Sequence, residues 1–191
     1  MDRFNWDFAI QTPWLIFIVY WFVSGLRVNK MQQPEPKGER LLRILVMLAA
    51  FYLLSYSDPN LGVLNLRFVG FHVRLFELGA ALTWAGVAFA IWARIHLGRY
   101  WSATVALREG HTLIRSGPYA RIRHPIYTGM LLAVAGTALA VGRYRALVAF
   151  AIVLAGFIRK SKREEALLAK QFGSEFEEHR RRTGFFLPRL T

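Results

Sequence analysis

Two polar segments in an otherwise apolar sequence carry the side chains whose types suit chemistry. Residues 97–127 include His124, and residues 159–191 include the adjacent carboxylates Glu164 and Glu165. Imidazole and carboxylate groups bind charged ligands and exchange protons. The sequence contains no cysteine, so thiolate nucleophiles, disulfides and cysteine-based zinc sites are excluded, and no metal site is expected.

His124 directly precedes Pro125, at the start of a long apolar run. The residue before a proline avoids the helical conformation, whereas proline suits the first helical position. A helix is therefore predicted to begin at Pro125, with His124 at or near its N-cap. The free N–H groups and positive dipole end of such a helix favour an anionic group such as a carboxylate. Taken alone, the pattern fits equally a histidine that only caps a helix.

The second polar segment has the pattern of a helix start. Ser161 followed three residues later by Glu164 fits a capping box. Apolar residues spaced by four then predict an amphipathic C-terminal helix at the membrane surface: Leu168, Phe172 and Phe176. On this pattern alone, Glu164 caps the helix and Glu165 faces solvent.

Five apolar runs surround these segments: residues 9–26, 41–56, 75–93, 125–141 and 146–158. A perpendicular membrane span needs roughly 20 apolar residues, with about 17 as the lower bound. The second run has Arg43 in its first turn, and the fifth is long enough only if Arg159 and Lys160 snorkel to the interface. The sequence therefore predicts an all-α integral membrane protein with about five transmembrane helices, an inner-side loop and the C-terminal amphipathic helix.

The basic residues are distributed unevenly between the two sides of this arrangement. With the N-terminus outside, the inner segments (residues 27–43, 94–124 and 159–191) hold 20 of the 25 Lys and Arg residues. The positive-inside rule then predicts an odd number of crossings and a C-terminus on the cytoplasmic side. Membrane lipids, and not nucleic acid, are the expected partners, because no basic stripe is interleaved with a polar, soluble fold.

The fourth and fifth runs are joined only by residues 142–145, which predicts a tight antiparallel helical hairpin. Small residues recur at spacings of three and four along the fourth run, where a neighbouring helix can approach closely: Gly129, Ala133, Gly136 and Ala140. We expect one structural domain, in which residues 1–93 form three N-terminal spans and residues 94–191 carry the polar segments.

Together these motifs resemble the signature of the isoprenylcysteine carboxyl methyltransferase family and its phospholipid-methyltransferase relatives. The matching elements are Gly110–Ile114, Gly117–Tyr119, Arg123–Gly129, a helical hairpin, Glu164–Glu165 and Phe172–Gly173. The resemblance covers about residues 94–188, half of the chain. It implies a methyltransferase that uses S-adenosylmethionine, with residues 94–191 as its catalytic half and the polar loop as its cofactor loop.

The resemblance also implies which residues form the site. The cofactor-binding positions would be Thr104, His111, Thr112, Leu113, Ile114, Tyr119, His124, Pro125, Ile126, Tyr127 and Glu164. In the family a basic residue four positions before the glutamate orients the substrate. Here that residue is Lys160 and not the expected arginine, with Arg159 and Arg163 nearby. Lysine cannot hold a carboxylate as a bidentate fork, so the sequence leaves the substrate open. No residue is assigned a catalytic role.

S-adenosylmethionine carries a carboxylate, an ammonium and a sulfonium, so its site needs both signs of charge and an apolar slot for adenine. Methyl transfer is an in-line displacement, and a carboxylate nucleophile needs no general base. Alignment and desolvation would then do most of the work. The lead acceptor is the C-terminal carboxylate of a prenylated cysteine. A phospholipid amine and a small hydrophobic thiol are the alternatives.

Other functions fit the sequence less well. Membrane sterol reductases that use NADPH share a similar Arg-His-Pro-x-Tyr element but are usually larger. A soluble Rossmann-type methyltransferase would carry G-x-G-x-x-G after a strand, which is not present. A non-enzymatic membrane scaffold or transporter is the remaining alternative. Transporters usually show repeated halves or interrupted spans with ionisable residues at mid-depth, and this sequence shows neither.

Overall fold

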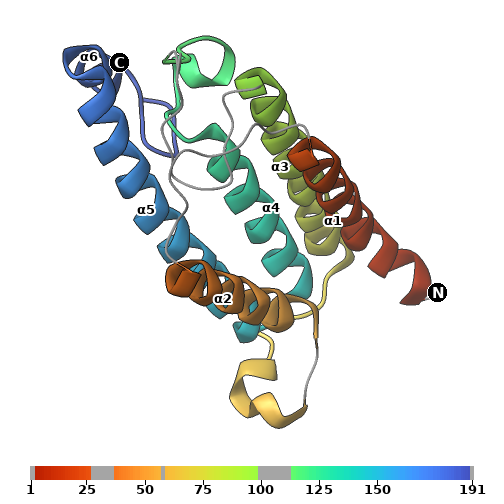
Figure 1. The fold of residues 1–191 in the computed structure, drawn as a ribbon. Coiled ribbons are helices and arrows are strands. Elements are labelled where there is room, and N and C mark those ends of the chain that lie inside the picture. The colour runs from red at the N-terminus through yellow and green to blue at the C-terminus, as the bar shows by residue number, and fades with distance from the viewer. Residues whose placement is uncertain (1–2, 27–36, 57–58, 99–112, 190–191) are drawn as a thin grey trace.

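The computed structural model describes residues 3–26, 37–56, 59–98 and 113–189. Within these ranges the regular structure is entirely helical, which confirms the all-α prediction. The helices are α1 (Arg3–Leu26), α2 (Lys37–Ser55), α3 (Val73–Leu97), α4 (Pro125–Val141), α5 (Tyr144–Phe172) and α6 (Ser174–Arg182), with short 3-10 helices η1 (Pro59–Asn65) and η3 (Gly117–Ala120) (Figure 1). The five apolar runs lie on α1 to α5 in order.

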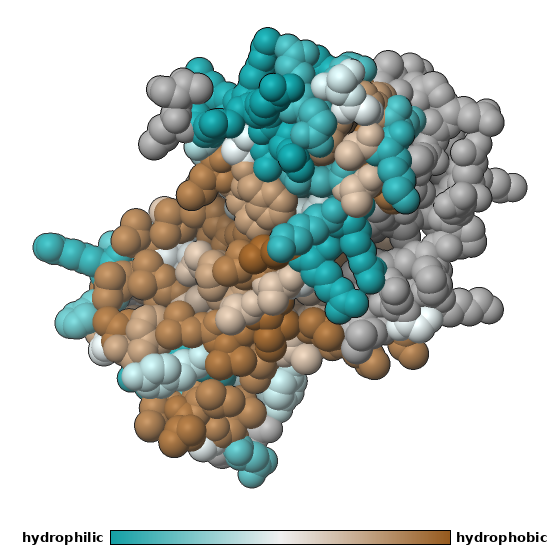
Figure 2. All heavy atoms as spheres, turned by 90° about the vertical axis from the view of Figure 1, so that its left-hand side faces the viewer, coloured by the Kyte–Doolittle hydropathy of each residue, from teal (hydrophilic) through white to brown (hydrophobic). Residues whose placement is uncertain are grey.

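Two of the helices are long and apolar enough to cross a membrane, through Phe8–Gly25 of α1 and Val73–Leu97 of α3. Shorter apolar stretches, Ile44–Ser55 and Pro125–Val141, lie on α2 and α4. Large hydrophobic side chains remain exposed along the flanks of the bundle, and Figure 2 shows this apolar surface below a hydrophilic end. An apolar surface of this extent indicates contact with lipid or another partner. The count of five spans remains a prediction.

Helices α3 and α4 pack through glycines. A Cβ atom added to Gly86 of α3 would lie 2.5 Å from the carbonyl oxygen of Gly129 of α4, and one added to Gly79 would lie 2.6 Å from that of Gly136. The backbones therefore touch where the side chains are smallest. This contact confirms the small-residue face predicted for the fourth apolar run.

Hydroxyl and indole groups join three helices near these glycines. The Thr83 hydroxyl of α3 lies 3.2 Å from the Thr137 hydroxyl of α4, and the Trp14 indole N–H of α1 donates to Thr137 over 3.0 Å. In an apolar bundle such bonds satisfy polar groups that could not form hydrogen bonds with lipid chains. They fix α1 against the α3–α4 pair.

Helices α4 and α5 form the predicted tight hairpin. Gly142 has a left-handed backbone (φ 63°) and its N–H donates to the Ala138 carbonyl, which ends α4. Two residues later α5 begins. The buried Arg145 guanidinium donates to the carbonyls of Leu53 and Leu54 at the end of α2, so α2 is attached to the start of α5.

The predicted helix start at Ser161 is wrong. Helix α5 continues without a break from Tyr144 to Phe172, and Ser161 is fully buried in its middle. The stretch after the apolar run contains strong helix formers and no glycine or proline, so nothing ends the helix before Gly173. The predicted amphipathic helix is therefore divided at Gly173, with Leu168 and Phe172 at the end of α5 and the buried Phe176 on α6.

Candidate functional site

The first turn of α4 and the C-terminal part of α5 bring His124 against the two glutamates. His124 is the N-cap residue of α4, as predicted, but its side chain makes no capping hydrogen bond. Its Nε2 lies 3.1 Å from Glu165 Oε1, and its Nδ1 lies 3.6 Å from Glu164 Oε2. The imidazole is only 5% exposed. The capping-only role is therefore wrong, and so is a solvent-facing Glu165.

Tyr127 fixes the position of Glu164. Its hydroxyl donates a 2.6 Å hydrogen bond to Glu164 Oε1, and its ring stacks on Phe157 of α5 with centroids 4.8 Å apart. The Lys160 ammonium lies 3.9 Å from the same carboxylate oxygen and 5.3 Å from the centre of the Tyr127 ring. Three different groups, a phenol, an imidazole and an ammonium, therefore surround one carboxylate.

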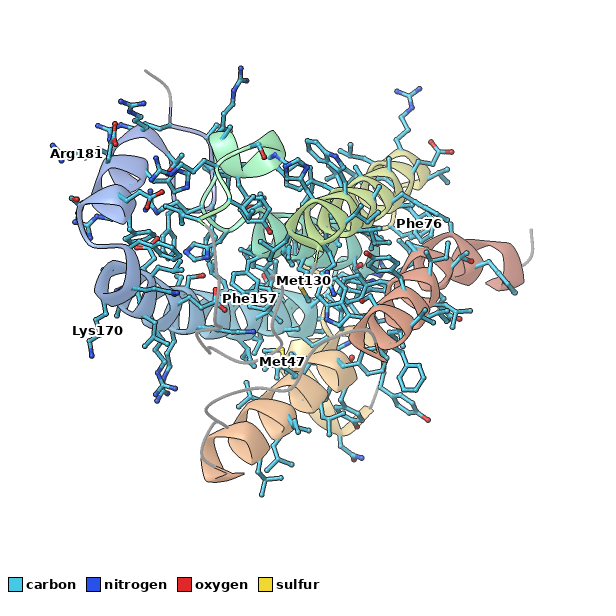
Figure 3. The ribbon with its side chains drawn as sticks, turned by 45° about the horizontal axis from the view of Figure 1, so that its top comes forward. Met47, Phe76, Met130, Phe157, Lys170 and Arg181 are labelled. Carbon is cyan, nitrogen blue, oxygen red and sulfur yellow. The ribbon has the colours of Figure 1, made fainter. Side chains whose placement is uncertain are left out.

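An apolar cluster between α4 and α5 packs against this polar group of side chains. Phe157 points into the bundle toward Met130 of α4, whereas Lys170, further along α5, points away from it (Figure 3). Tyr127 packs on the same hydrophobic cluster. Along α5, the side chains thus change from apolar core residues at Phe157 to charged site residues at Glu165, about two turns later.

Arg123 holds the second glutamate. Its Nε donates to Glu165 Oε1 over 2.6 Å, with both side chains largely buried. The guanidinium also donates to the backbone carbonyls of Arg180 and Thr183 beyond α5. Arg123 and Glu165 lie in the sequence motifs but were not predicted as site residues. Their adjacency to His124 and Glu164 was the signal that could have found them.

A C-terminal segment, residues 183–187, covers His124 and was also missed. The backbone N–H of His124 donates to the Phe185 carbonyl, and the Thr128 hydroxyl donates to the Phe186 carbonyl over 2.7 Å. The Phe185 ring lies 5.0 Å from the imidazole, and an isolated bridge pairs Ile122 with Gly184. Only tertiary structure brings this segment to α4, and its sequence carries no signal for the contact.

The charges of the site reinforce one another. Burial alone would lower the pKa of His124, but Glu164 and Glu165 outweigh it and raise the pKa above its ordinary value of 6.5. Burial opposes ionisation of both glutamates, yet His124 and Lys160 lower the pKa of Glu164, and His124 and Arg123 lower that of Glu165. The two carboxylates thus favour the protonated form of His124, and His124 in turn favours the ionised form of both glutamates.

The remaining predicted cofactor positions are distributed as follows. Thr104, His111 and Thr112 lie outside the described residues. Leu113 and Ile114 are partly buried ahead of η3, and Tyr119, Pro125 and Ile126 are buried. The Tyr119 hydroxyl donates to the Ala93 carbonyl of α3, and burial followed by the charge of Glu164 raises its pKa. Tyr119 therefore attaches η3 to α3.

Lys160, one of the predicted substrate-binding residues, lies against Glu164 and the Tyr127 ring in the cluster. Arg159 and Arg163 are exposed on α5. Among the described residues, no group of His, Asp and Glu has the arrangement of a metal site. The carboxylates of Glu164 and Glu165 are already paired with Arg123, His124 and Lys160. Such pairs are typical of a site that binds an organic ion.

Comparisons with known proteins cover this region. Residues 79–170 match the isoprenylcysteine carboxyl methyltransferase (ICMT) family model. The cobalt-zinc-cadmium resistance protein CzcN of Cupriavidus metallidurans is 42% identical over 101 residues, which is 50% of this chain and 44% of that protein. The protein-S-isoprenylcysteine O-methyltransferase of Schizosaccharomyces pombe is 31% identical over 99 residues, 50% of this chain and 42% of that protein.

A probable protein-S-isoprenylcysteine O-methyltransferase of Oryza sativa subsp. indica is 34% identical over 109 residues, 56% of this chain and 52% of that protein. The chain spans about half the length of the curated relatives it matches. The family match runs from α3 to the end of α5 and contains both His124 and the glutamate pair. Residues 79–170 of this chain are therefore similar to the isoprenylcysteine carboxyl methyltransferase family, the family that its motifs resemble.

Proposed function

We propose that the protein is an S-adenosylmethionine-dependent methyltransferase that acts on a lipophilic acceptor in the membrane. The observation that carries this proposal is the cluster of His124, Tyr127, Glu164 and Glu165, which joins the start of α4 to the C-terminal part of α5. The family match over the same residues supports it.

The residues present fit the proposed cofactor. A cation is already held by the Tyr127 ring and the Glu164 carboxylate, because the Lys160 ammonium lies against both. The partly buried Leu113 and Ile114 and the buried Tyr119 offer apolar surface for an adenine ring. Bound S-adenosylmethionine would supply an electrophilic methyl group on its sulfonium.

The chain's own residues would then bind the cofactor and orient it. Glu164 supplies negative charge to the cofactor, and the Arg123–Glu165 pair keeps His124 in place. Pro125, Ile126 and Tyr127 close the first turn of α4 over the site, and the Phe185 ring shields the imidazole. Thr104, His111 and Thr112 complete the proposed cofactor loop. Because the reaction needs no general base, its rate would depend mainly on aligning the two reactants and excluding water from them.

The lead acceptor is the carboxylate of a prenylated cysteine, and the names of the fission yeast and rice relatives support this choice. Lys160, Arg159 and Arg163 would attract that carboxylate. Because lysine acts as a point charge and not as a fork, a different lipophilic acceptor is the second candidate. The 42% identity to a protein named for metal resistance also favours a wider range of acceptors.

The proposed setting is a bilayer crossed five times, with the N-terminus outside and the C-terminus in the cytoplasm. The exposed hydrophobic flanks of α1, α2 and α3 support contact with lipid. The hydrophilic end that holds the site would face the cytoplasm, where S-adenosylmethionine enters. A lipophilic acceptor would then reach the same site from the bilayer.

Transfer of a tritiated methyl group tests this function. Purified protein in liposomes is incubated with methyl-labelled S-adenosylmethionine and N-acetyl-S-farnesylcysteine, phosphatidylethanolamine or a short alkyl thiol. A prenylcysteine ester releases labelled methanol in alkali, whereas N-methyl and S-methyl products keep their label. We expect alkali-labile label with the farnesylated compound and much less of it with Glu164→Gln at the same concentration of S-adenosylmethionine. Absence of transfer to all three acceptors would contradict the proposed function.

A further inference from the structure

Arginines gather at the end of the bundle that lies opposite the charged cluster. This end holds η1 and the turn between α4 and α5, whereas α6 lies at the other end (Figure 1). Although Arg67 and Arg143 are far apart in the sequence, an isolated antiparallel bridge pairs them here. In the proposed topology this is the outer side, where the positive-inside rule leads us to expect few basic residues. Their convergence therefore calls for a physical reason.

The bridge places the two arginines directly opposite each other. Backbone hydrogen bonds of 3.1 Å flank it on both sides, from Phe68 to the Gly142 carbonyl and from Tyr144 to the Leu66 carbonyl. Arg67 and Arg143 are therefore a non-hydrogen-bonded pair, whose side chains leave the same face at the shortest spacing. Like charges in this position destabilise a pair of strands. An anion bound between them would remove this cost.

Arg145 adds a third positive charge in the first turn of α5. Its side chain is only 4% exposed, and its Nε is buried without a hydrogen-bond acceptor among the described residues. In the described ranges, neither Asp nor Glu forms an ion pair with Arg67, Arg143 or Arg145. The first turn of α5 contains no acidic residue, so the positive dipole end of the helix reinforces the same charge.

The surroundings of these arginines suit a lipid better than a soluble anion. Helix α4 ends at Val141, and the hydrophobic side chains of Leu147 and Val148 are exposed on α5 just beyond Arg145. The arginines thus lie where the apolar flank of the bundle ends, which is the depth of lipid headgroups. A guanidinium matches the oxygens of a phosphate with two parallel hydrogen bonds. Basic pockets between transmembrane helices bind anionic headgroups in this way.

We propose that Arg67 and Arg143 bind the phosphate of an anionic phospholipid, and that Arg145 strengthens the attraction from the first turn of α5. The phosphate supplies the negative charge that the described residues do not provide. The acyl chains lie along the exposed Leu147 and Val148. The bound lipid holds the segment after η1 against the α4–α5 turn. This site is separate from the charged cluster, so the proposal does not depend on the methyltransferase function.

Native mass spectrometry of the full chain in detergent tests the site. The protein is titrated with dioleoyl phosphatidylglycerol, which has a net negative charge, and with dioleoyl phosphatidylcholine, which has none. We expect one phosphatidylglycerol to bind with clear preference over phosphatidylcholine. Arg67→Gln and Arg143→Gln should each weaken the binding of phosphatidylglycerol about tenfold or more, as the loss of a charge-assisted hydrogen bond does.

Arg74→Gln is the matched control, because Arg74 is exposed in the first turn of α3 and its loss removes the same charge. It should leave the affinity for phosphatidylglycerol unchanged. Thermal unfolding without added lipid shows whether each variant is folded, and Arg67→Gln alone decides the test if Arg143→Gln does not fold, since Arg67 is exposed.

Three results would overturn the proposal. Arg67→Gln could bind phosphatidylglycerol as the unmodified protein does, or Arg74→Gln could lose as much affinity, in which case only net charge matters. Equal binding of the two lipids to the unmodified protein would exclude selection for an anionic headgroup. Displacement of phosphatidylglycerol by an equal concentration of inorganic phosphate would show that the site takes a soluble anion and that the lipid assignment is wrong.

Discussion

His124 shows how far residue types and spacing determine a site. Its place at the N-cap of α4 was predicted from Pro125 alone. Its partners were predicted only in part, because neighbours such as Glu164 and Glu165 point about 100° apart on a helix. The imidazole has two nitrogens and lies between them, so each nitrogen faces one carboxylate. This placement depends on how α4 crosses α5, which the spacing within either helix does not encode.

Glu164→Gln should separate a structural role from a ligand-binding one. Glutamine keeps the Tyr127 hydrogen bond but loses the negative charge that a cationic cofactor needs. We expect the variant to fold and to lose affinity for S-adenosylmethionine by about 10- to 150-fold, equivalent to the roughly 1.5–3 kcal/mol of a charged hydrogen bond. Calorimetric titration measures the loss. Affinity equal to that of the unmodified protein would remove Glu164 from the site.

Glu165→Gln should show the opposite pattern. Glu165 accepts from Arg123 and His124, and a neutral amide leaves these two largely buried donors without their anionic acceptor. We expect a loss of about 1–3 kcal/mol in the free energy of unfolding. A smaller change in cofactor affinity than for Glu164→Gln would accompany it. Denaturation of both variants in the same detergent compares them, and an unchanged stability would contradict this role.

The raised pKa of His124 predicts how stability depends on pH. Its stabilising contribution is fully present below the ordinary value of 6.5 and is lost as the pH rises through the higher value in the folded protein. The lowered pKa values of Glu164 and Glu165 act at the other end, since their contributions are present above 4.5 and lost on acidification. At pH values between these two limits, the cluster should make its largest contribution to the stability of the folded protein.

Melting temperatures of the protein and of His124→Gln, recorded between pH 5.5 and 9, check this dependence. The difference between the two should be largest near pH 6 and should shrink as the pH rises. A difference that stays constant over the range would mean that the charge on His124 does not stabilise the fold.

At the scale of elements, the glycines of α3 and α4 decide how closely the helices approach. A Cβ atom at Gly86 would lie 2.4 Å from the Ala133 backbone nitrogen, so Gly86→Ala must push the helices apart. We expect it to destabilise the protein by about 1–3 kcal/mol, as overpacking does. Gly25→Ala in α1, where an added Cβ meets nothing within 4 Å, is the control and should be neutral or stabilising. Thermal unfolding in detergent measures both, and equal effects would contradict the close contact.

The elements also show where sequence patterns mislead. Ser161 and Glu164 match a capping box, yet both lie inside a 29-residue helix. The pattern records only that serine and glutamate are three residues apart. It carries no information on whether the preceding turn is already helical. The end of α5 was better marked, because Gly173 takes a positive φ of 50° that other residues disfavour.

At the scale of the whole molecule, the order of apolar and basic segments predicts the sidedness. Reporter tags at Met1 and Thr191 should lie on opposite sides of the membrane, because the inner segments hold 20 of 25 basic residues. Accessibility to a membrane-impermeant reagent in oriented vesicles measures this. Both tags on one side would remove a crossing and change which side the site faces.

The helical content and the positions of α1 to α5 could be predicted because apolar length is a strong signal in these segments. The C-terminal cover over His124 could not, since Gly184 and Phe185 reach it through backbone contacts with residues about 60 positions earlier. Such contacts depend on the path of α5 and α6 together. The family resemblance identified the motifs, and the structure added how Arg123 and Glu165 support them.

Equilibrium binding of S-adenosylmethionine to the purified protein in detergent tests the central claim most directly, with NADPH as the control ligand. The account predicts saturable binding of S-adenosylmethionine at one site per chain, reduced in Glu164→Gln, and no binding of NADPH. Binding of NADPH in its place would favour a reductase. Binding of neither would favour a non-enzymatic membrane protein, and both results would contradict the account.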